Sequence, residues 1–245
     1  MTIRVKEFMT QYTRENVVMT SKNKTGRILE RRILILAIIL SAFIGSAVCP
    51  ASAGEGKMSS LINERLREVL KKGVVVIVEE PPVEHKQFVT AGIWINAPRE
   101  EVWKLVTDFV RYPEFFPEVE TVMVLKSEGN ARDVLHKVKS GISVLPLRFS
   151  YTLRFVLEPP GRMTWSLVGG DLKFSDGSWE LYEMEGGKET VVFYRITYEI
   201  VPKGFLVKTV IKYVSEKNPV FEVAAISATA LTVVKSVKDE LEKNK

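Results

Sequence analysis

Apolar and polar residues alternate along several segments in the second half of the chain. Between residues 147 and 155 every second residue is apolar, and the residues between them are Arg, Ser or Thr. The same alternation recurs at 163–167 and at 194–200. A period of two predicts strands with one apolar and one polar face. We therefore predict a sheet with one dry face, which another element must cover.

Glycine, proline and asparagine clusters divide this region into short segments, which predicts strands joined by tight turns. The predicted strands are 87–95, 119–127, 131–140, 146–158, 162–168, 177–184 and 189–201. Consecutive strands joined by short turns predict an antiparallel sheet. Two short helices are predicted after the first strand, at Arg99–Phe109 and at Tyr112–Phe116, because Pro98 favours a helix start and Pro113 and Pro117 bracket a compact aromatic turn.

The C-terminal segment is predicted to be the helix that covers the dry face. Pro219 predicts a kink or break between this helix and an apolar stretch at 205–213. The seam that we predict to face the sheet consists of Val220, Ala224, Ala228, Leu231, Val234 and Leu241. Because residues 224–230 are mostly small, we predict a cavity beneath that part of the helix.

Residues 54–85 are predicted to be an N-terminal extension. Residues 59–72 have the pattern of an amphipathic helix that ends at Gly73, and an unbroken β-branched run at 74–78 predicts a strand. We expect both to pack at the edge of the domain. A helix that binds a membrane surface or a partner is the alternative.

Residues 1–53 are predicted to be a signal peptide or an N-terminal membrane anchor. An apolar run of 16 residues, Ile33–Val48, follows several arginines, and Ala51-Ser52-Ala53 forms an A-x-A cleavage site before Gly54. Spanning a bilayer takes about 20 apolar residues, so cleavage before Gly54 is favoured. This predicts an exported protein of the periplasm or cell envelope. The pattern leaves open whether Met1 or Met19 is the start.

Charge and composition remove several classes of function. The net charge of +5 belongs to residues 1–53, which have eight Lys and Arg against three Glu. The remaining residues are formally neutral, so a nucleic-acid partner is not expected. The only cysteine is Cys49 and the only histidines are His85 and His136, which makes a zinc site improbable. No nucleotide-binding or hydrolase motif is present, and we predict no cofactor, metal or catalytic residue.

Four segments together resemble a known superfamily. They are Ala97-Pro98, the turn Tyr112–Pro117, the stretch Val144–Phe149 and Gly177–Leu181. In this order, residues 86 to 243 resemble the START-like, polyketide-cyclase-like superfamily (SRPBCC), especially its coenzyme Q-binding and ribosome-association-toxin-like members. The resemblance implies an α+β helix-grip fold for 86–245, in which a curved antiparallel sheet of about seven strands wraps around a long C-terminal helix. The superfamily has no universal catalytic motif to carry over.

The resemblance also implies a cavity for a hydrophobic small molecule, such as a lipid, an isoprenoid quinone or a polyketide-like compound. Most candidate ligand contacts are rings of the dry face, with a histidine as polar anchor, two phenylalanines as a gate, and two alanines of the helix. They are Phe115, Phe116, His136, Phe149, Tyr151, Trp165, Trp179, Tyr198, Ala224 and Ala228. Packing without ligand contact is the alternative for the rings. The glycine-rich segment 169–177 is predicted to be a flexible loop at the cavity mouth.

Three functions are compatible with these patterns. The leading hypothesis is an exported, non-enzymatic binding or carrier protein for a hydrophobic small molecule, with peripheral membrane contact as a compatible feature. The second is an enzyme of the cyclase or dehydratase type, in which His136 and Tyr151 handle protons. The third is a protein-interaction module. The sequence predicts no oligomeric state.

Overall fold

The computed structural model describes residues 64–79, 86–139, 148–202 and 220–243, together with 204–205, 208–209 and 212–213. All of them belong to one compact unit, Ser59–Lys245, and the other unit, Met1–Met58, lies outside the described residues. The predicted signal, Cys49, His85 and the stretch 144–147 also lie outside them. So does Pro219, and the kink at this residue stays a prediction.

The described residues form one eight-stranded antiparallel sheet in the order β1-β2-β8-β7-β6-β5-β4-β3. The strands are β1 (Val75–Val78), β2 (Val89–Ile95), β3 (Val119–Glu128), β4 (Ala131–Lys139), β5 (Arg148–Glu158), β6 (Arg162–Gly170), β7 (Leu172–Met184) and β8 (Glu189–Ile200). The helices are α4 (Glu64–Lys72), α5 (Arg99–Thr107), η1 (Phe109–Arg111), α6 (Tyr112–Phe115), η2 (Glu185–Gly187) and α8 (Phe221–Glu242). The predicted α+β helix-grip fold is confirmed. The eighth strand is β1, which pairs with β2 and extends the predicted sheet.

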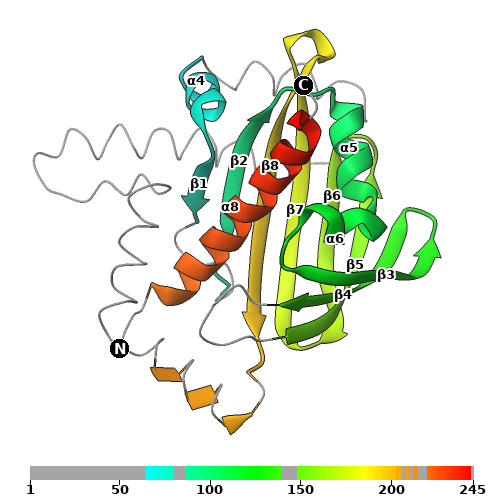
Figure 1. Ribbon diagram of the computed structural model, residues 1–245, viewed down its shortest axis with the longest axis vertical. Helices are drawn as coiled ribbons and strands as arrows, with labels where there is room; N and C mark the ends of the chain where they lie inside the picture. The colour runs from blue at the N-terminus through cyan, green and yellow to red at the C-terminus, as the bar shows by residue number, and fades with distance from the viewer. Residues whose placement is uncertain are drawn as a thin grey trace, which may run out of the picture. The chain divides into compact units, whose positions relative to one another are not determined.

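One face of the sheet, called the inner face below, is covered by α8 (Figure 1). Helix α8 lies across β2 and β8, while α5, η1 and α6 lie beside it over the other strands (Figure 1). The end of α8 is anchored by hydrogen bonds: Lys238 Nζ donates to the Trp94 carbonyl over 2.9 Å, and the Asn96 N–H donates to Glu242 Oε1 over 2.8 Å. These bonds hold the C-terminal half of α8 against the end of β2.

Helices α5 and α6 form where the proline positions predicted them. The Pro98 carbonyl accepts the N–H groups of Glu101 and Val102 over 3.0 and 3.2 Å and so starts α5. The Tyr112 hydroxyl donates to the Val106 carbonyl over 2.6 Å. This bond ties α6 back to α5 and places the rings of α6 over the inner face.

The N-terminal extension is part of the sheet and covers its outer face. Leu70 of α4 is 1% exposed and packs with Trp94 and Val191 on the face opposite α8. Beyond β1, Glu79 accepts both Arg195 Nε and Arg195 Nη2 over 2.6 and 2.8 Å. Because β2 is covered by α8 on one face and α4 on the other, all of its residues are buried.

The predicted flexible loop at 169–177 is wrong. Strand β6 ends at Gly170 and β7 begins at Leu172, so this segment is paired strand with a short connection. Its glycines serve packing as well as turning. A Cβ on Gly177 would overlap the Trp165 ring and the Arg195 carbonyl oxygen, so glycine is required for Trp165 to lie flat across β7.

The predicted seam of α8 is wrong in its first half. The buried stripe of α8 consists of Ile226, Ala230, Val234 and Val237, and Leu231 of the predicted seam is also buried. Ala224 and Ala228 each lie two residues from Ile226, which is about 200° around a helix. They therefore point away from the stripe, and Val220 is 58% exposed.

Among the described residues, no helix is both long and apolar enough to cross a membrane.

Candidate ligand-binding site

Aromatic side chains from α6 and the neighbouring strands form a continuous run across the inner face. At one end, the Phe116 ring lies 4.8 Å from that of Tyr112, which lies 6.2 Å from the His136 ring. His136 of β4 is stacked on Tyr151 of β5, with ring centroids 5.4 Å apart and planes at 14°. The backbone register explains this stack, because His136 and Tyr151 are direct cross-strand partners.

The run continues over β5 to β8. The Phe155 ring lies 5.9 Å from Trp165, and Trp165 is stacked on Tyr194 at 5.3 Å. The Tyr194 ring in turn lies 4.5 Å from that of Trp179. These residues occupy alternate positions on their strands, so the pleat places all of them on the face that α8 covers.

His136 is a neutral group inside this run. It is 4% exposed, and its Nδ1 lies 3.2 Å from the Val134 carbonyl oxygen. Burial lowers the pKa of His136 to about 4, although the hydrogen bond to the carbonyl acts in the opposite direction. The imidazole is therefore uncharged at neutral pH and behaves as a polar but neutral ring.

The phenols around His136 are also held neutral. Burial raises the pKa of Tyr151, Tyr194 and Tyr198 above the ordinary value of 10.0. The Tyr198 hydroxyl lies 3.0 Å from Thr229 Oγ1 on α8. This contact joins β8 to the N-terminal half of the covering helix.

The inner face is not packed equally along α8. Val234 and Val237 in the C-terminal half of the helix and Ala230 near its middle are fully buried. Near the N-terminal half, several apolar residues that face the core remain only partly buried. They are Tyr151, Leu167 and Tyr198 on the strands. This is the part of the inner face where a bound molecule has side chains to contact.

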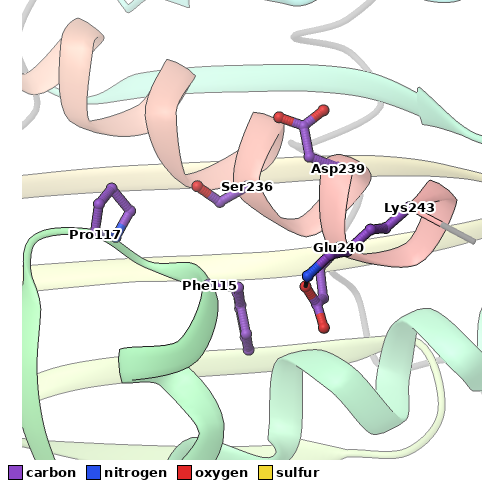
Figure 2. Close-up of a pocket in the computed structure, with 6 residues that line it drawn as sticks. All are labelled: Phe115, Pro117, Ser236, Asp239, Glu240 and Lys243. Atoms are coloured by element: carbon purple, nitrogen blue, oxygen red, sulfur yellow. Dashed lines mark ion pairs between the residues drawn. The ribbon is translucent and has the colours of Figure 1, made fainter.

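A separate open hollow of about 490 Å³ lies between α6 and the last turns of α8 (Figure 2). Phe115 and Pro117 form its apolar side, and the remaining lining residues are Ser236, Asp239, Glu240 and Lys243. Glu240 pairs with Arg111 over 3.2 Å. The hollow therefore has a charged rim that differs from the ring-lined inner face.

A family model described as "Polyketide cyclase / dehydrase and lipid transport" matches residues 95–219. The chain belongs to this family. The matched segment extends from the end of β2 to beyond β8, so it contains every ring of the run described above. Helix α8 follows it in the chain.

Solved structures with a similar fold include other START-like proteins. Human STARD10 is 14% identical, with a TM-score of 0.50, and the match covers 82% of this chain and 83% of that one. The Zhui aromatase/cyclase from Streptomyces sp. R1128 is 17% identical with a TM-score of 0.49, covering 65% of this chain and 95% of that one. A START superfamily protein from Mycobacterium smegmatis is 16% identical with a TM-score of 0.45, covering 64% and 99%. These likenesses concern the fold. A search of curated proteins gave no match.

Most of the predicted contact residues of this family member lie together. His136, Tyr151, Trp165 and Trp179 belong to the ring run, and Tyr198 reaches α8 through Thr229. Phe115 and Phe116 are 9% and 7% exposed and pack in the core at one end of the run. That any of these side chains contacts a ligand stays a prediction.

Three predicted contacts lie elsewhere. Phe149 is partly buried at the start of β5, apart from the core cluster. Ala224 and Ala228 point away from the buried stripe of α8, so this orientation disfavours them as the roof of a cavity. The small-residue pattern alone does not specify which side of the helix faces the sheet.

Sequence reasoning missed four residues that complete the site. Tyr194 lies at the centre of the ring run, Tyr112 joins α6 to His136, and Phe155 lies between His136 and Trp165. Thr229 supplies the polar contact from α8. The period of two already placed Tyr194 on the face of Tyr198, and Phe155 on that of Tyr151, so the signal for both was present.

Proposed function

We propose that this protein binds a hydrophobic small molecule between the inner face of its sheet and the N-terminal half of α8. The observation that carries the proposal is the aromatic inner face, on which Tyr151 and Tyr198 stay partly exposed near the small-residue half of α8. A family of polyketide cyclases and lipid transport proteins is the expected setting for such a site. Apolar pockets with few polar groups are typical of small-molecule sites.

The electrostatics of the site support binding in preference to proton chemistry. General acid–base catalysis works best when the pKa of the catalytic group lies near the working pH. His136, with a pKa of about 4, is a weak base, and burial makes Tyr151 and Tyr194 weaker acids than free tyrosine. We therefore favour a binding protein or carrier over the cyclase-type alternative.

The test uses two substitutions on opposite sides of α8. Val233 lies four residues after Thr229, on the side that packs against the core, whereas Ala228 points away from it. Val233→Phe should fill space beside Tyr198 and weaken binding at least tenfold, and Ala228→Phe should leave affinity unchanged. Isothermal titration with a panel of isoprenoid quinones, long-chain alcohols and polyketide-like phenols measures this, with circular dichroism to confirm that both variants are folded.

Two outcomes would contradict the proposal. If no member of the panel binds the wild-type protein, it is not a binder of these compounds. If Ala228→Phe abolishes binding and Val233→Phe does not, the ligand lies on the other side of α8, as the sequence pattern first predicted.

We also propose that the protein is exported and acts in the cell envelope. The support is the apolar run Ile33–Val48 and the Ala51-Ser52-Ala53 site, both outside the described residues. Export would place a binder of hydrophobic molecules between membranes, where a carrier is useful. Determination of the mature N-terminus tests it, as set out in the Discussion.

A further inference from the structure

Two phenol hydroxyls on the inner face make no hydrogen bond with any other described residue. They belong to Tyr151 and Tyr194. The Tyr194 side chain is 7% exposed and lies between Trp165 and Trp179. Both hydroxyls are therefore available to a bound molecule, and Trp165 Nε1 in the same run is a buried donor without a partner among the described residues.

The other buried or half-buried tyrosines provide the comparison. Tyr112 donates to the Val106 carbonyl, Tyr182 donates to Glu180 over 2.6 Å, and Tyr198 is paired with Thr229. Among the described tyrosines, the buried or half-buried ones without a hydroxyl partner are thus Tyr151 and Tyr194, both in the ring run. The raised pKa of Tyr194 is caused first by burial and then by the neighbouring hydroxyls of Tyr151, Tyr112 and Tyr198, so these phenols share one region.

His136 adds a third unpaired polar atom beside them. Its Nδ1 is close to the Val134 carbonyl, while its Nε2 makes no hydrogen bond with another described residue. When Nδ1 carries the proton and donates to that carbonyl, Nε2 is an acceptor. Because His136 is stacked on Tyr151, this acceptor and the Tyr151 hydroxyl belong to neighbouring rings.

Charge near these groups is negative. Among described side chains, the charged group that influences the pKa values of Tyr151 and Tyr198 is Glu118, and no Lys or Arg does so. Glu118 directly precedes β3 and makes no ion pair with another described residue. Burial raises the pKa of its carboxyl group. An anionic head group placed here would meet the Glu118 carboxylate, which has no ion-pair partner among the described residues.

We propose that this site holds an uncharged ligand by a carbonyl or hydroxyl oxygen, which is hydrogen-bonded to Tyr151 and Tyr194, and that it rejects fatty acid carboxylates. The inference rests on the proposed ligand-binding function and specifies its chemistry. Neutral phenols and a neutral imidazole suit an oxygen that carries no charge, whereas Glu118 repels an anion. Selection of this kind combines a favourable contact for one ligand with an unfavourable one for its competitor.

The test compares ligands that differ only in their head group. Dodecan-1-ol, dodecan-2-one and dodecanoate are titrated at pH 8 into the wild-type protein by isothermal calorimetry. The alcohol and the ketone should bind at least tenfold more tightly than the carboxylate. Tyr194→Phe, which removes one hydroxyl and keeps the ring, should weaken the alcohol and ketone about 3- to 10-fold, the range for one hydrogen bond.

Two further variants test whether the changes in affinity are specific to the phenols of the inner face and to the Glu118 charge. Tyr182→Phe removes a hydroxyl that is bonded to Glu180 on the outer face, and it should change no affinity. Glu118→Gln should raise the affinity for dodecanoate several-fold and leave that for the alcohol unchanged. Equal affinities for alcohol and carboxylate, or an unchanged affinity in Tyr194→Phe, would overturn the inference while leaving ligand binding intact. Failure of all three compounds to bind would instead count against the proposed function.

Discussion

Lowering the pH should destabilise the fold through His136. Its neighbours are the rings of Tyr112, Tyr151 and Phe155, and its side chain is buried. The pKa is 6.5 for the free side chain and about 4 in the folded protein. Since the folded value is the lower one, the unfolded chain takes up the proton first as the pH falls. Stability is fully present above pH 6.5 and is lost progressively toward pH 4.

The size of the effect follows from the two pKa values. Between pH 7 and pH 5, the unfolded histidine becomes protonated while the folded one stays neutral, which costs about 2 kcal/mol of unfolding free energy. Other groups also titrate in this range. Glu118, with a raised pKa, acts in the opposite direction because the folded protein binds its proton more tightly than the unfolded chain. A variant that lacks the imidazole is therefore needed as a reference.

The reference variant is His136→Phe, which keeps a ring among rings. Urea unfolding at pH 7 and pH 5 gives the pH-dependent change in stability for each protein, and the difference between the two proteins isolates His136. We expect the wild type to lose about 2 kcal/mol more than the variant. Imidazole NMR provides a second readout, because the chain has two histidines, His85 and His136. An identical pH dependence in both proteins, or a His136 pKa near 6.5, would refute the buried, neutral imidazole.

Three further predictions concern packing, ion pairing and export. Gly177→Ala should lower the unfolding free energy by about 1–3 kcal/mol or prevent folding. The control Gly73→Ala should be nearly neutral, because a Cβ at Gly73 meets nothing within 4 Å. Similar melting temperatures for the two variants would contradict the close approach of Trp165 to β7. Arg195→Lys should lower the unfolding free energy by about 1 kcal/mol, because lysine loses the two hydrogen bonds to Glu79 and the position over the Phe88 ring. The control Arg148→Lys should lower it little, because the Arg148 side chain is 73% exposed. An equal loss of unfolding free energy in both variants would argue against a special role for the Glu79 pair. Sequencing of the mature protein from the cell envelope should begin at Gly54, and an intact Met1 or Met19 in the cytosol would end the export proposal.

The faces of the strands could be predicted from the sequence because the period of two is a local property. Met163, Trp165 and Leu167 point inward in β6 while the two polar residues between them point outward, as the alternation indicated. Strong alternation also indicated Tyr198 and Tyr151 correctly as inner-face residues. A shift of one residue in the register would turn the apolar side chains of such strands to the solvent. Because this restricts the register, the sheet could be predicted from the sequence.

The orientation of α8 could not be predicted in the same way. Its first half is apolar and small-residued on more than one side, so local spacing allowed a seam through Ala228 as readily as the observed one through Ile226 and Ala230. The choice depends on contacts with β2 and β8, which lie far away in the chain. Tyr198 and Thr229, for example, are separated by 31 residues.

The segment 169–177 shows a second reason why part of the structure could not be predicted from the sequence. Gly170 and Gly177 read as turn residues, yet the first lies in β6 and the second makes room for the Trp165 ring. A glycine that permits close approach has the same sequence signature as a glycine that permits a turn. Only the register that pairs Trp165 with Gly177 distinguishes the two roles.

Native mass spectrometry of the protein purified from its own cells tests most directly whether the inner face holds a hydrophobic molecule. The account predicts a population that is heavier than the polypeptide by the mass of one small organic compound, which organic solvent releases and which is uncharged at neutral pH. Val233→Phe should remove this added mass, and Ala228→Phe should retain it. A wild-type protein with the mass of the polypeptide alone, which also fails to take up any compound of the panel, would contradict the account.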